Sequence, residues 1–588
     1  MLVMLFLIVI LAFVLRLIVA QYVEIVPDEI VYSLLPWKMI SAQRLGTVDG
    51  GPLFSYFTDV SYTLFGGVNA TSTRFPSIFF GSLAVVLIYI CSLKMFGNRW
   101  AALFSAFLFA VSGYVLENNT EPDMMAFFFA LLSAYFFFFF LEGKKNYLYL
   151  STASLTLAAL CKILPLILVP VYVLVYFLHA KGYLKTKDDE EEQVKSLADK
   201  KLGKKLLDLD LLKTMLGCLV IVFLLLMPVV LYNYLEYKNN GKTENVVSTL
   251  LGIGAPFHPE TSQIDPWNFS IMLGFLKIFF SKFFMPDPLV VGLGILGILL
   301  VLPQRRSEHF MLILSASLLL TYVGGITGSA SHYLWIPLVL SLFAGYVIER
   351  ACAYVSSKFK LRSVSVVFVF VLMISSVSFI HFHSIISEKS ASMKLREYVV
   401  ENIPKSAIVV MDPRIYHGSY AWILNERHYI SGIYFQALLE NAAGSAAPKI
   451  EVPLYYIECS GDTTCGWKIE DYERISPFAE NLAAYLKGNL AYLGEVDANH
   501  RFFIYSGAIT VPSSTFQSID RTHVFWGSSV GWKYPDLNID EYPLQGSNKV
   551  FHILGLLFLY LDLLLVLLAI ALVFVFLFRS EKQTDQKA

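Results

Sequence analysis

Long apolar runs separated by short polar stretches fill the first 380 residues of the chain and return near its end. Residues 2–20 contain a single charged side chain, Arg16, and a helical run of this length can cross a hydrocarbon core of roughly 30 Å. The pattern predicts twelve membrane-spanning helices. They cover residues 2–20, 75–96, 101–116, 124–141, 147–160, 163–178, 216–231, 289–302, 310–323, 333–354, 364–380 and 550–578.

Basic residues set the predicted orientation of these spans. Lys94, Arg99, Lys144, Lys145 and the lysine-rich stretch 181–213 all fall on one side, which the positive-inside rule makes cytoplasmic. Both termini are then cytoplasmic. We therefore predict a multi-pass protein of the cell membrane whose remaining loops are external.

Hydropathy falls between residues 381 and 549, and the pattern changes to that of a soluble domain. Short apolar runs typical of buried strands alternate there with stretches of helical spacing. We predict a transmembrane module at 1–380, an external α/β domain at 381–549, and a last helix with a cytoplasmic tail at 550–588. The predicted strands of the external domain are 407–411, 452–457 and 501–505, and its predicted helices are 390–401 and 477–487.

Composition and charge narrow the class of protein. With 56% hydrophobic and 15% charged residues and a mean hydropathy of +0.60, the chain cannot be a soluble enzyme. The net charge of -1 indicates no nucleic-acid partner. Of the six cysteines, Cys459 and Cys465 lie in a polar, turn-rich segment. Their spacing permits a disulfide if that segment faces an oxidising compartment.

Acidic residues collect in the loops that this topology places outside. Asp28 and Glu29 follow the first span at a depth where unpaired charge is costly, so a functional interpretation competes with simple solubility of the loop. A carboxylate can accept the proton of a substrate hydroxyl while cations stabilise a departing phosphate, although a single cation can equally snorkel to the interface. The other loop acids are Asp49, Asp59, Glu117, Glu121 and Asp123, and the nearby cations are Lys38, Arg44, Arg74, Lys162 and the titratable His332.

Several of these residues stand in short motifs that follow one another in a fixed order. The motifs are Pro27-Asp-Glu-Ile-Val-Tyr32, Asp49-Gly-Gly-Pro-Leu53, Phe65-Gly66, Arg74-Phe-Pro-Ser77, Phe96-Gly97 and Asp123 at the start of a span. In these motifs the sequence resembles the GT-C membrane glycosyltransferases. Within them it is most similar to the protein O-mannosyltransferase and aminoarabinose-transferase branch, which is glycosyltransferase family 39-like. The resemblance covers about the first 180 residues well and residues 332–337 weakly.

The resemblance implies an inverting transfer of a sugar, mannose-like or another hexose, from a polyprenyl or dolichyl phosphate. The acceptor would be a hydroxyl of a protein, glycan or lipid on the external face. Carried over onto this chain, Asp28 is the general base and Glu29 its neighbour in the acidic pair. A divalent metal is possible, because loop acids touch one in some relatives, but side chains alone can neutralise a monophosphate leaving group. The implied acceptor or sugar site contains Asp49, Glu121 and Asp123, and the implied lipid-phosphate contacts are Arg74, Lys162, His332 and Tyr333.

Two positions depart from the family pattern, and three other functions stay open. Gly51 stands where relatives often have a basic residue, and His332 where they often have an arginine. Phosphate contacts would then rest more on Arg74 and Lys162, with His332 as a weaker, pH-dependent partner. An oligosaccharyltransferase is disfavoured because the soluble domain contains no Trp-Trp-Asp-type motif. A transporter is disfavoured because these acids lie in loops, and a non-catalytic bundle that binds a partner is the third alternative.

Overall fold

The computed structural model describes most of the chain. The residues outside the description are 26–28, 30–44, 47–50, 187–208, 242, 244–273, 275–276, 278, 327–330, 360–362, 416–419, 425–426, 461–464, 466–468, 498–500, 516–529, 532–541 and 588. Two predicted site residues, Asp28 and Asp49, are among them, so their roles stay predictions.

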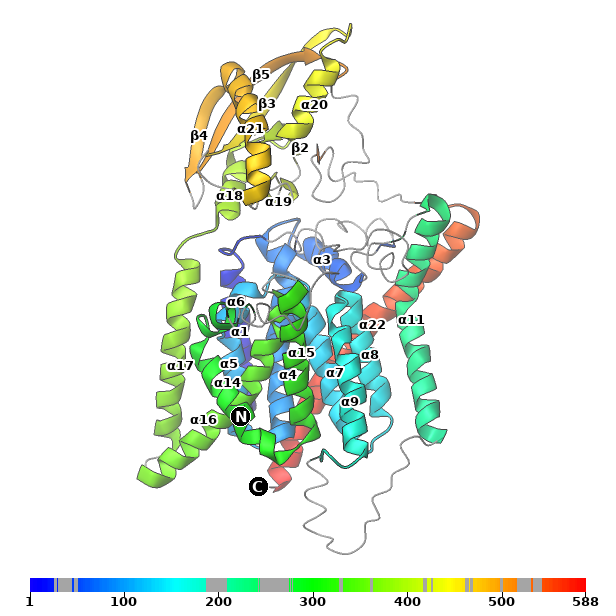
Figure 1. Ribbon diagram of the computed structural model, residues 1–588, viewed down its shortest axis with the longest axis vertical. Coiled ribbons are helices and arrows are strands. Elements are labelled where there is room, and N and C mark those ends of the chain that lie inside the picture. The colour runs from blue at the N-terminus through cyan, green and yellow to red at the C-terminus, as the bar shows by residue number, and fades with distance from the viewer. Residues whose placement is uncertain are drawn as a thin grey trace, which may run out of the picture.

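A helical bundle forms the larger part of the described chain, and each predicted span overlaps at least one of its helices (Figure 1). The predicted span 101–116 is divided between two helices, of which the first ends at Ala110 and the second begins at Gly113. Seven described helices are long and apolar enough to cross a membrane, and shorter apolar helices complete the bundle. The exact number of spans therefore stays a prediction. The helices are α1 (Leu2–Val19), α4 (Ala70–Phe96), α5 (Arg99–Ala110), α7 (Asp123–Leu141), α8 (Tyr147–Cys161), α9 (Leu168–Ala180), α11 (Leu209–Asn240), α14 (Pro288–Val301), α15 (Ser307–Ile326), α16 (Trp335–Phe359), α17 (Ser363–Ile386) and α22 (Gly546–Lys587).

Helix α4 packs against α1, α5 and α7, and local sequence signals fix both of its ends. At its start, the Asn69 side chain accepts a hydrogen bond from the backbone N–H of Ser72, whose hydroxyl accepts one from the backbone N–H of Asn69. At its end, Gly97 adopts the left-handed conformation with φ of 68°, which favours glycine. Short helices α3 (Leu53–Leu64) and α6 (Gly113–Asn118) lie at the end of the bundle where α4 begins (Figure 1).

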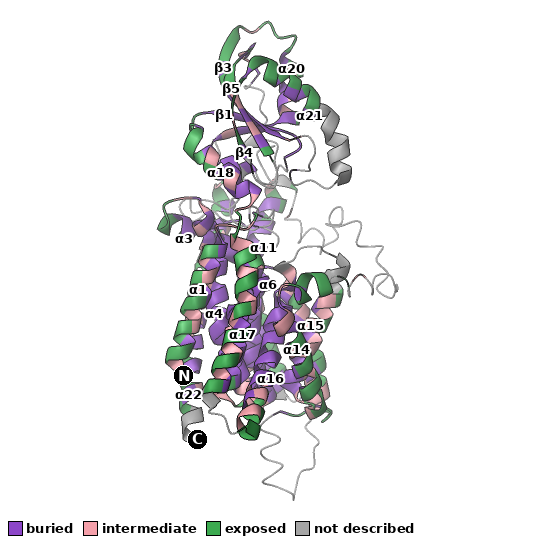
Figure 2. Ribbon diagram, turned by 90° about the vertical axis from the view of Figure 1, so that its left-hand side faces the viewer, coloured by how far each residue is buried: buried purple, intermediate pink, exposed green. Residues whose placement is uncertain are grey.

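Exposed residues lie along the peripheral helices, while the helices inside the bundle are mostly buried (Figure 2). Val3 on α1, Ile380 on α17 and Leu564 on α22 are 72%, 71% and 61% exposed. Such surfaces are unfavourable in water and suit contact with lipid. The burial pattern therefore agrees with a multi-pass membrane protein.

The second part of the structure is a mixed six-stranded sheet with helices on both faces. The strand order is β4-β5-β3-β1-β2-β6, in which β1 is parallel to β2 and β3, and β5 is antiparallel to β3 and β4. The strands are β1 (Ile408–Met411), β2 (His428–Ser431), β3 (Lys449–Cys459), β4 (Ala491–Asp497), β5 (Arg501–Pro512) and β6 (Val530–Gly531). The helices are α18 (Ala391–Asn402), α19 (Tyr420–Leu424), α20 (Gly432–Ala442) and α21 (Ile469–Asn489).

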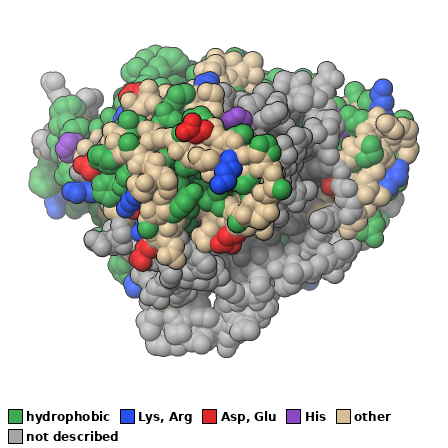
Figure 3. All heavy atoms as spheres, turned by 90° about the horizontal axis from the view of Figure 1, so that it is seen from above, with side chains coloured by type: hydrophobic (Ala, Val, Ile, Leu, Met, Phe, Trp, Pro, Cys, Tyr) green, Lys and Arg blue, Asp and Glu red, His purple; other side chains and the backbone are tan. Residues whose placement is uncertain are grey.

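The structure confirms the predicted strands as β1, β3 and β5 and the predicted helices as α18 and α21, and it adds β2, β4 and β6. We call residues 391–531 the sheet domain. It stands on one end of the bundle, and both chain termini lie at the opposite end (Figure 1). Seen from above the sheet domain, charged side chains are scattered among hydrophobic and other ones (Figure 3).

Candidate functional site

Arg74 and Glu29 meet inside the end of the bundle that carries the sheet domain. Nε and Nη2 of Arg74 donate to the two carboxylate oxygens of Glu29 at 2.6 and 2.9 Å. Nη1 donates to the carbonyls of Ala20 and Val23 at 2.5 and 3.2 Å, and Nη2 also donates to the Glu24 carbonyl at 3.0 Å. These bonds use all five N–H donors of the guanidinium, and Arg74 is 0% exposed. The arginine therefore binds its own chain, which favours a positioning role over the predicted phosphate contact.

The same face of α4 holds the second acid-bearing loop. Ser77 lies three residues beyond Arg74, so both side chains project from one side of the helix. The Ser77 hydroxyl donates to the Glu121 carbonyl at 2.6 Å. Helix α4 thus anchors the loop that contains Glu29 and the loop that contains Glu121 next to each other. Ser77 belongs to a family motif, but the sequence alone indicated no role for it.

Four of the predicted site residues form one buried polar cluster, which we call the Lys162 cluster. Its members are Glu121, Asp123, Lys162 and His332. Lys162 Nζ lies 2.7 Å from Asp123 Oδ2, 3.3 Å from His332 Nδ1 and 3.9 Å from Glu121 Oε2. His332 Nδ1 lies 3.1 Å from Asp123 Oδ1. The carboxyl-bearing residues and Lys162 are all below 8% exposed, so these charges interact in a medium much less polar than water.

Three members of the Lys162 cluster stand at or beside the end of a helix, and Glu121 lies in the turn before α7. Asp123 is the first residue of α7, where a negative charge is favourable beside the unpaired N–H groups. Lys162 directly follows α8, and His332 lies in the 3-10 turn η5 (Ser331–Tyr333) just before α16. Tyr333 is 1% exposed and its ring packs against Phe283, with centroids 5.4 Å apart. Its predicted contact with the lipid phosphate stays a prediction.

Gly51 explains how the chain passes close to Lys162. A Cβ on Gly51 would lie 2.1 Å from the carbonyl oxygen of Leu160, at the end of α8. Any side chain there would collide with backbone, so the basic residue that relatives often have cannot be accommodated in this geometry. Glycine at position 51 is thus required by the close approach of the chain to the end of α8.

Three members of the Lys162 cluster carry groups that can bind a metal ion. Glu121, Asp123 and His332 each offer a ligand atom, and these atoms lie within 4.8 Å of one another. However, the ammonium of Lys162 is already 2.7 Å from Asp123 Oδ2. A divalent ion would have to displace this charge, because two cations so close would repel each other strongly. As placed, the residues fit a cluster centred on an ammonium group and do not fit a metal site.

Comparison with known proteins identifies the fold. A family model described as dolichyl-phosphate-mannose-protein mannosyltransferase matches residues 49–188. Crystal structures of ArnT from Cupriavidus metallidurans, in the apo state and bound to undecaprenyl phosphate, each match with a TM-score of 0.52 over 85% of this chain and 97% of that chain, at 12% and 14% identity. The chain has a GT-C fold. The structural matches, at 12% and 14% identity, concern the fold of the chain, and the family model matches one part of it.

Two further comparisons concern a weaker structural match and the curated proteins. The apo oligosaccharyltransferase of Archaeoglobus fulgidus matches this GT-C chain with a TM-score of 0.47 at 13% identity, over 87% of this chain and 76% of that chain. No curated protein matches the sequence. The family match at residues 49–188 includes Arg74, Glu121, Asp123 and Lys162, while His332 lies outside it.

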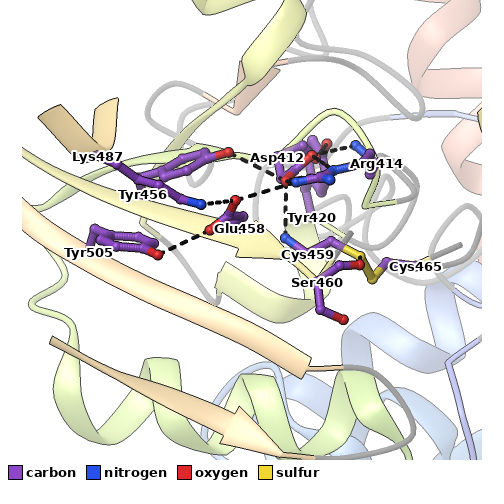
Figure 4. Close-up of polar contacts among 10 residues, drawn as sticks. All are labelled: Asp412, Arg414, Tyr420, Tyr456, Glu458, Cys459, Ser460, Cys465, Lys487 and Tyr505. Carbon is purple, nitrogen blue, oxygen red and sulfur yellow. Dashed lines mark hydrogen bonds and ion pairs between the residues drawn. A yellow bond between two sulfur atoms is a disulfide. The ribbon is translucent and has the colours of Figure 1, made fainter. Parts of the chain in front are cut away.

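The sheet domain of this GT-C protein contains a second polar network, at the end of β1 (Figure 4). Asp412 accepts hydrogen bonds from Arg414 Nη2 at 2.6 Å and from the backbone N–H of Cys459 at 3.0 Å. Glu458 accepts one from the Tyr505 hydroxyl at 3.1 Å, and Lys487 Nζ lies 2.5 Å from its carboxylate. Burial and the Glu458 carboxylate raise the pKa of Tyr505 to about 12, so its hydroxyl remains a donor.

A disulfide joins Cys459 to Cys465 beside this network (Figure 4), as their spacing permits. The backbone of Cys465 also forms a bridge with that of Ile415, three residues beyond Asp412. Sequence reasoning did not single out Asp412 or Arg414. The available signal was an acid placed directly after a buried parallel strand, since such carboxyl ends meet at one edge of a sheet.

Asp287 is another residue that sequence reasoning missed. Its carboxylate accepts hydrogen bonds from the Ser112 hydroxyl at 2.7 Å and from the backbone N–H groups of Gly113 and Tyr114 at 2.8 and 2.9 Å. Burial raises the pKa of Asp287, although these hydrogen bonds oppose the shift. An Asp-Pro pair before an apolar run signals a helix start, but here the side chain caps a different helix, α6.

Proposed function

We propose that this protein transfers a sugar from a polyprenyl-phosphate donor to an acceptor hydroxyl. The observation that carries the proposal is the Lys162 cluster, in which a lysine and a histidine meet two carboxylates at the sheet-domain end of the bundle. A buried ammonium held by carboxylates is suited to receive a phosphate charge when a donor enters. The crystal structure of ArnT bound to undecaprenyl phosphate supports the class of donor.

In the proposed reaction, Asp28 accepts the proton of the acceptor hydroxyl. The oxygen attacks the anomeric carbon, the bond from that carbon to the phosphate oxygen breaks, and the electron pair leaves with the lipid phosphate. General base catalysis of this kind contributes about 10²–10⁴-fold to the rate. Asp49 and Glu121 would contact the sugar or the acceptor.

Lys162 and His332 would stabilise the phosphate as its negative charge grows. Donors already held in position cost no reorganisation at the moment of reaction, which makes them effective in a site with little water. Asp123 orients both, because its two oxygens lie 2.7 Å from Lys162 Nζ and 3.1 Å from His332 Nδ1. In this proposal, side chains of the protein itself remove the acceptor proton and stabilise the leaving phosphate.

We further propose that the reaction takes place on the external side of the membrane, with both termini cytoplasmic. Support comes from the arrangement in Figure 1, where the termini lie at the end of the bundle opposite to the sheet domain. The disulfide of the sheet domain also suits an oxidising compartment. Single cysteines introduced at Lys144, which is 50% exposed, and at Glu480 test the orientation when a water-soluble label is added first to intact and then to permeabilised cells.

The decisive experiment supplies membranes with a panel of labelled polyprenyl-phosphate sugars, carrying mannose, glucose or aminoarabinose, and follows label into protein, glycan and lipid pools. We expect one donor to be used. Asp28→Asn should lower transfer by about 10²-fold or more without loss of expression. Glu117→Gln is the matched control, because its carboxylate is 49% exposed and lies 3.6 Å from His381 Nε2. Normal transfer by Asp28→Asn, or no transfer from any donor, would contradict the proposal.

A further inference from the structure

The chain that leads to the acid pair is anchored to two different parts of the molecule. On one side, Arg74 of the bundle binds the carboxylate of Glu29 and the carbonyl of Glu24. On the other side, Ile25 is 5% exposed and belongs to a buried cluster formed mainly by the sheet domain. We call this cluster the domain interface. It contains Ile25, Tyr62, Val68 and Ala70 from the bundle side, and Met393, Leu395, Val399, Ile415, Trp422, Ile457 and Cys465 among its sheet-domain members.

Helix α18 of the sheet domain also bonds directly to this part of the chain. The backbone N–H of Ser390, just before α18, donates to the carbonyl of Tyr22 at 2.8 Å. The backbone N–H of Ser392, in the first turn, donates to the Glu24 carboxylate at 3.4 Å. A negative charge at this position is favourable because the first N–H groups of a helix have no partner within it.

Arg396 connects the same helix to the start of α4. Its Nη2 donates to the carbonyl of Val68 at 2.7 Å, and its Nε donates to the carbonyl of Trp422 at 3.0 Å. The guanidinium also lies over the Trp422 ring, 4.0 Å from its centroid. Arg396 is 8% exposed, and burial lowers the pKa of its guanidinium to about 10. One side chain of α18 thus binds both α19 within the sheet domain and the bundle at Val68.

The polar network of Figure 4 is linked to two residues of the cluster that contains Ile25. Asp412 holds Arg414 and the backbone of Cys459, and the disulfide carries this restraint to Cys465, which pairs with Ile415. Ile415 and Cys465 both belong to the domain interface. The network therefore connects two members of the domain interface, Ile415 and Cys465, to the ends of β1 and β3.

We propose that the sheet domain is a positioning element for the transfer reaction. Ile25 is the positioning residue through which it holds the chain leading to Asp28 and Glu29. Arg396 is the positioning residue that binds the sheet domain to the bundle at Val68, and so keeps the surface that contacts residues 22–25 in place. The predicted effect on the transfer rate rests on the proposed function, whereas the contacts between the sheet domain and residues 20–25 do not. Misplacing a catalytic group by about 1 Å can cost 10²-fold in rate. A looser interface should therefore lower kcat while the KM for the donor stays nearly constant.

The test compares Ile25→Ala and Arg396→Gln with Leu438→Ala in the purified full-length protein. Leu438 is buried at 3% exposure in the cluster on the other face of the sheet, so its truncation loosens the sheet domain without touching residues 20–25. The first readout is hydrogen exchange of the Gln21, Tyr22 and Val23 amides, which donate to carbonyls at the end of α1. The second is kcat and KM with the active donor.

We expect faster exchange at residues 21–23 and a kcat about tenfold to a hundredfold lower in both interface variants, with wild-type values for both readouts in Leu438→Ala. Ile25→Val, which loses one methyl group, should fall between wild type and Ile25→Ala and serves if the larger truncation fails to fold. Unchanged exchange in the interface variants, or an equal kcat loss in Leu438→Ala, would overturn the proposal. If the wild-type protein transfers no sugar, the proposed function fails, and exchange alone decides whether the domain holds this chain.

Discussion

Glu29 and Arg74 form a two-pronged ion pair in which both carboxylate oxygens accept hydrogen bonds, at 2.6 and 2.9 Å. Because the other N–H groups of the same arginine reach the carbonyls of Ala20, Val23 and Glu24, one side chain fixes both ends of the segment 20–29. Both partners are at most 1% exposed. Arg74 and Glu29 therefore hold in place both ends of the segment that contains the proposed base.

Arg74→Lys should show that these hydrogen bonds depend on the shape of the guanidinium group as well as on its charge. An ammonium has three donors and cannot serve two carboxylate oxygens and three carbonyls together. We expect a lower melting temperature of the purified protein and a transfer rate lower by about one to two orders of magnitude. Arg350→Lys is the control, since that side chain is 67% exposed. Wild-type activity in Arg74→Lys would show that the position of the segment does not depend on the hydrogen bonds of the guanidinium group.

A second prediction concerns the coupling between Asp123 and Lys162. Removing one partner of a buried pair leaves the other charge uncompensated, which costs about 3–5 kcal/mol, whereas removing both is much less costly. Asp123→Asn and Lys162→Met should each destabilise the protein, and the double variant should lose less than the sum of the two. Thermal denaturation of the four proteins measures this coupling. Strictly additive losses would mean that the two side chains do not interact.

The third prediction is that transfer does not depend on a divalent metal. Lys162 Nζ occupies the position between the Asp123 and Glu121 carboxylates that a metal ion would need, at 2.7 and 3.9 Å from them. Prolonged treatment with EDTA should leave the initial rate of sugar transfer unchanged. The control is a return of Mn²⁺ or Mg²⁺ to the treated protein. A rate that falls on chelation and recovers with the metal would show that an ion replaces Lys162 in the working enzyme.

The helices of the bundle were predictable from sequence, because lipid contact and helix packing both require long apolar runs. Asp123, Lys162 and His332 could be named as candidate site residues as well, but not their contacts. Lys162 lies 39 residues from Asp123 and 170 from His332 in sequence, so their meeting depends on how the helices pack.

Other features of the site were beyond sequence reasoning for the same reason. Three of the five N–H donors of Arg74 bind backbone carbonyls, which are present at every residue and leave no pattern in a sequence. Strand β6 spans Val530–Gly531, too short to show any periodicity. The partners of Arg396 lie on two other elements, α19 and the start of α4, so its role follows from tertiary structure alone.

The last prediction concerns Asp562, an acid inside the apolar helix α22. Leu559, Asp562, Val566, Ala569, Val573 and Phe576 are all buried and repeat at intervals of three and four residues, so the aspartate interrupts the packed stripe of its helix. Among the described residues, neither carboxylate oxygen of Asp562 has a hydrogen-bond partner. A buried polar group without a partner costs about 1–3 kcal/mol.

Asp562→Leu should complete this stripe and raise the melting temperature of the detergent-solubilised protein, because it removes the desolvation cost and adds apolar contact. Asp562→Asn keeps a polar group of the same size at this position and should give little or no increase. Both variants should transfer sugar at the wild-type rate, since no predicted site residue lies on α22. A lower melting temperature or a loss of transfer in Asp562→Leu would instead show that the carboxyl group takes part in folding or function.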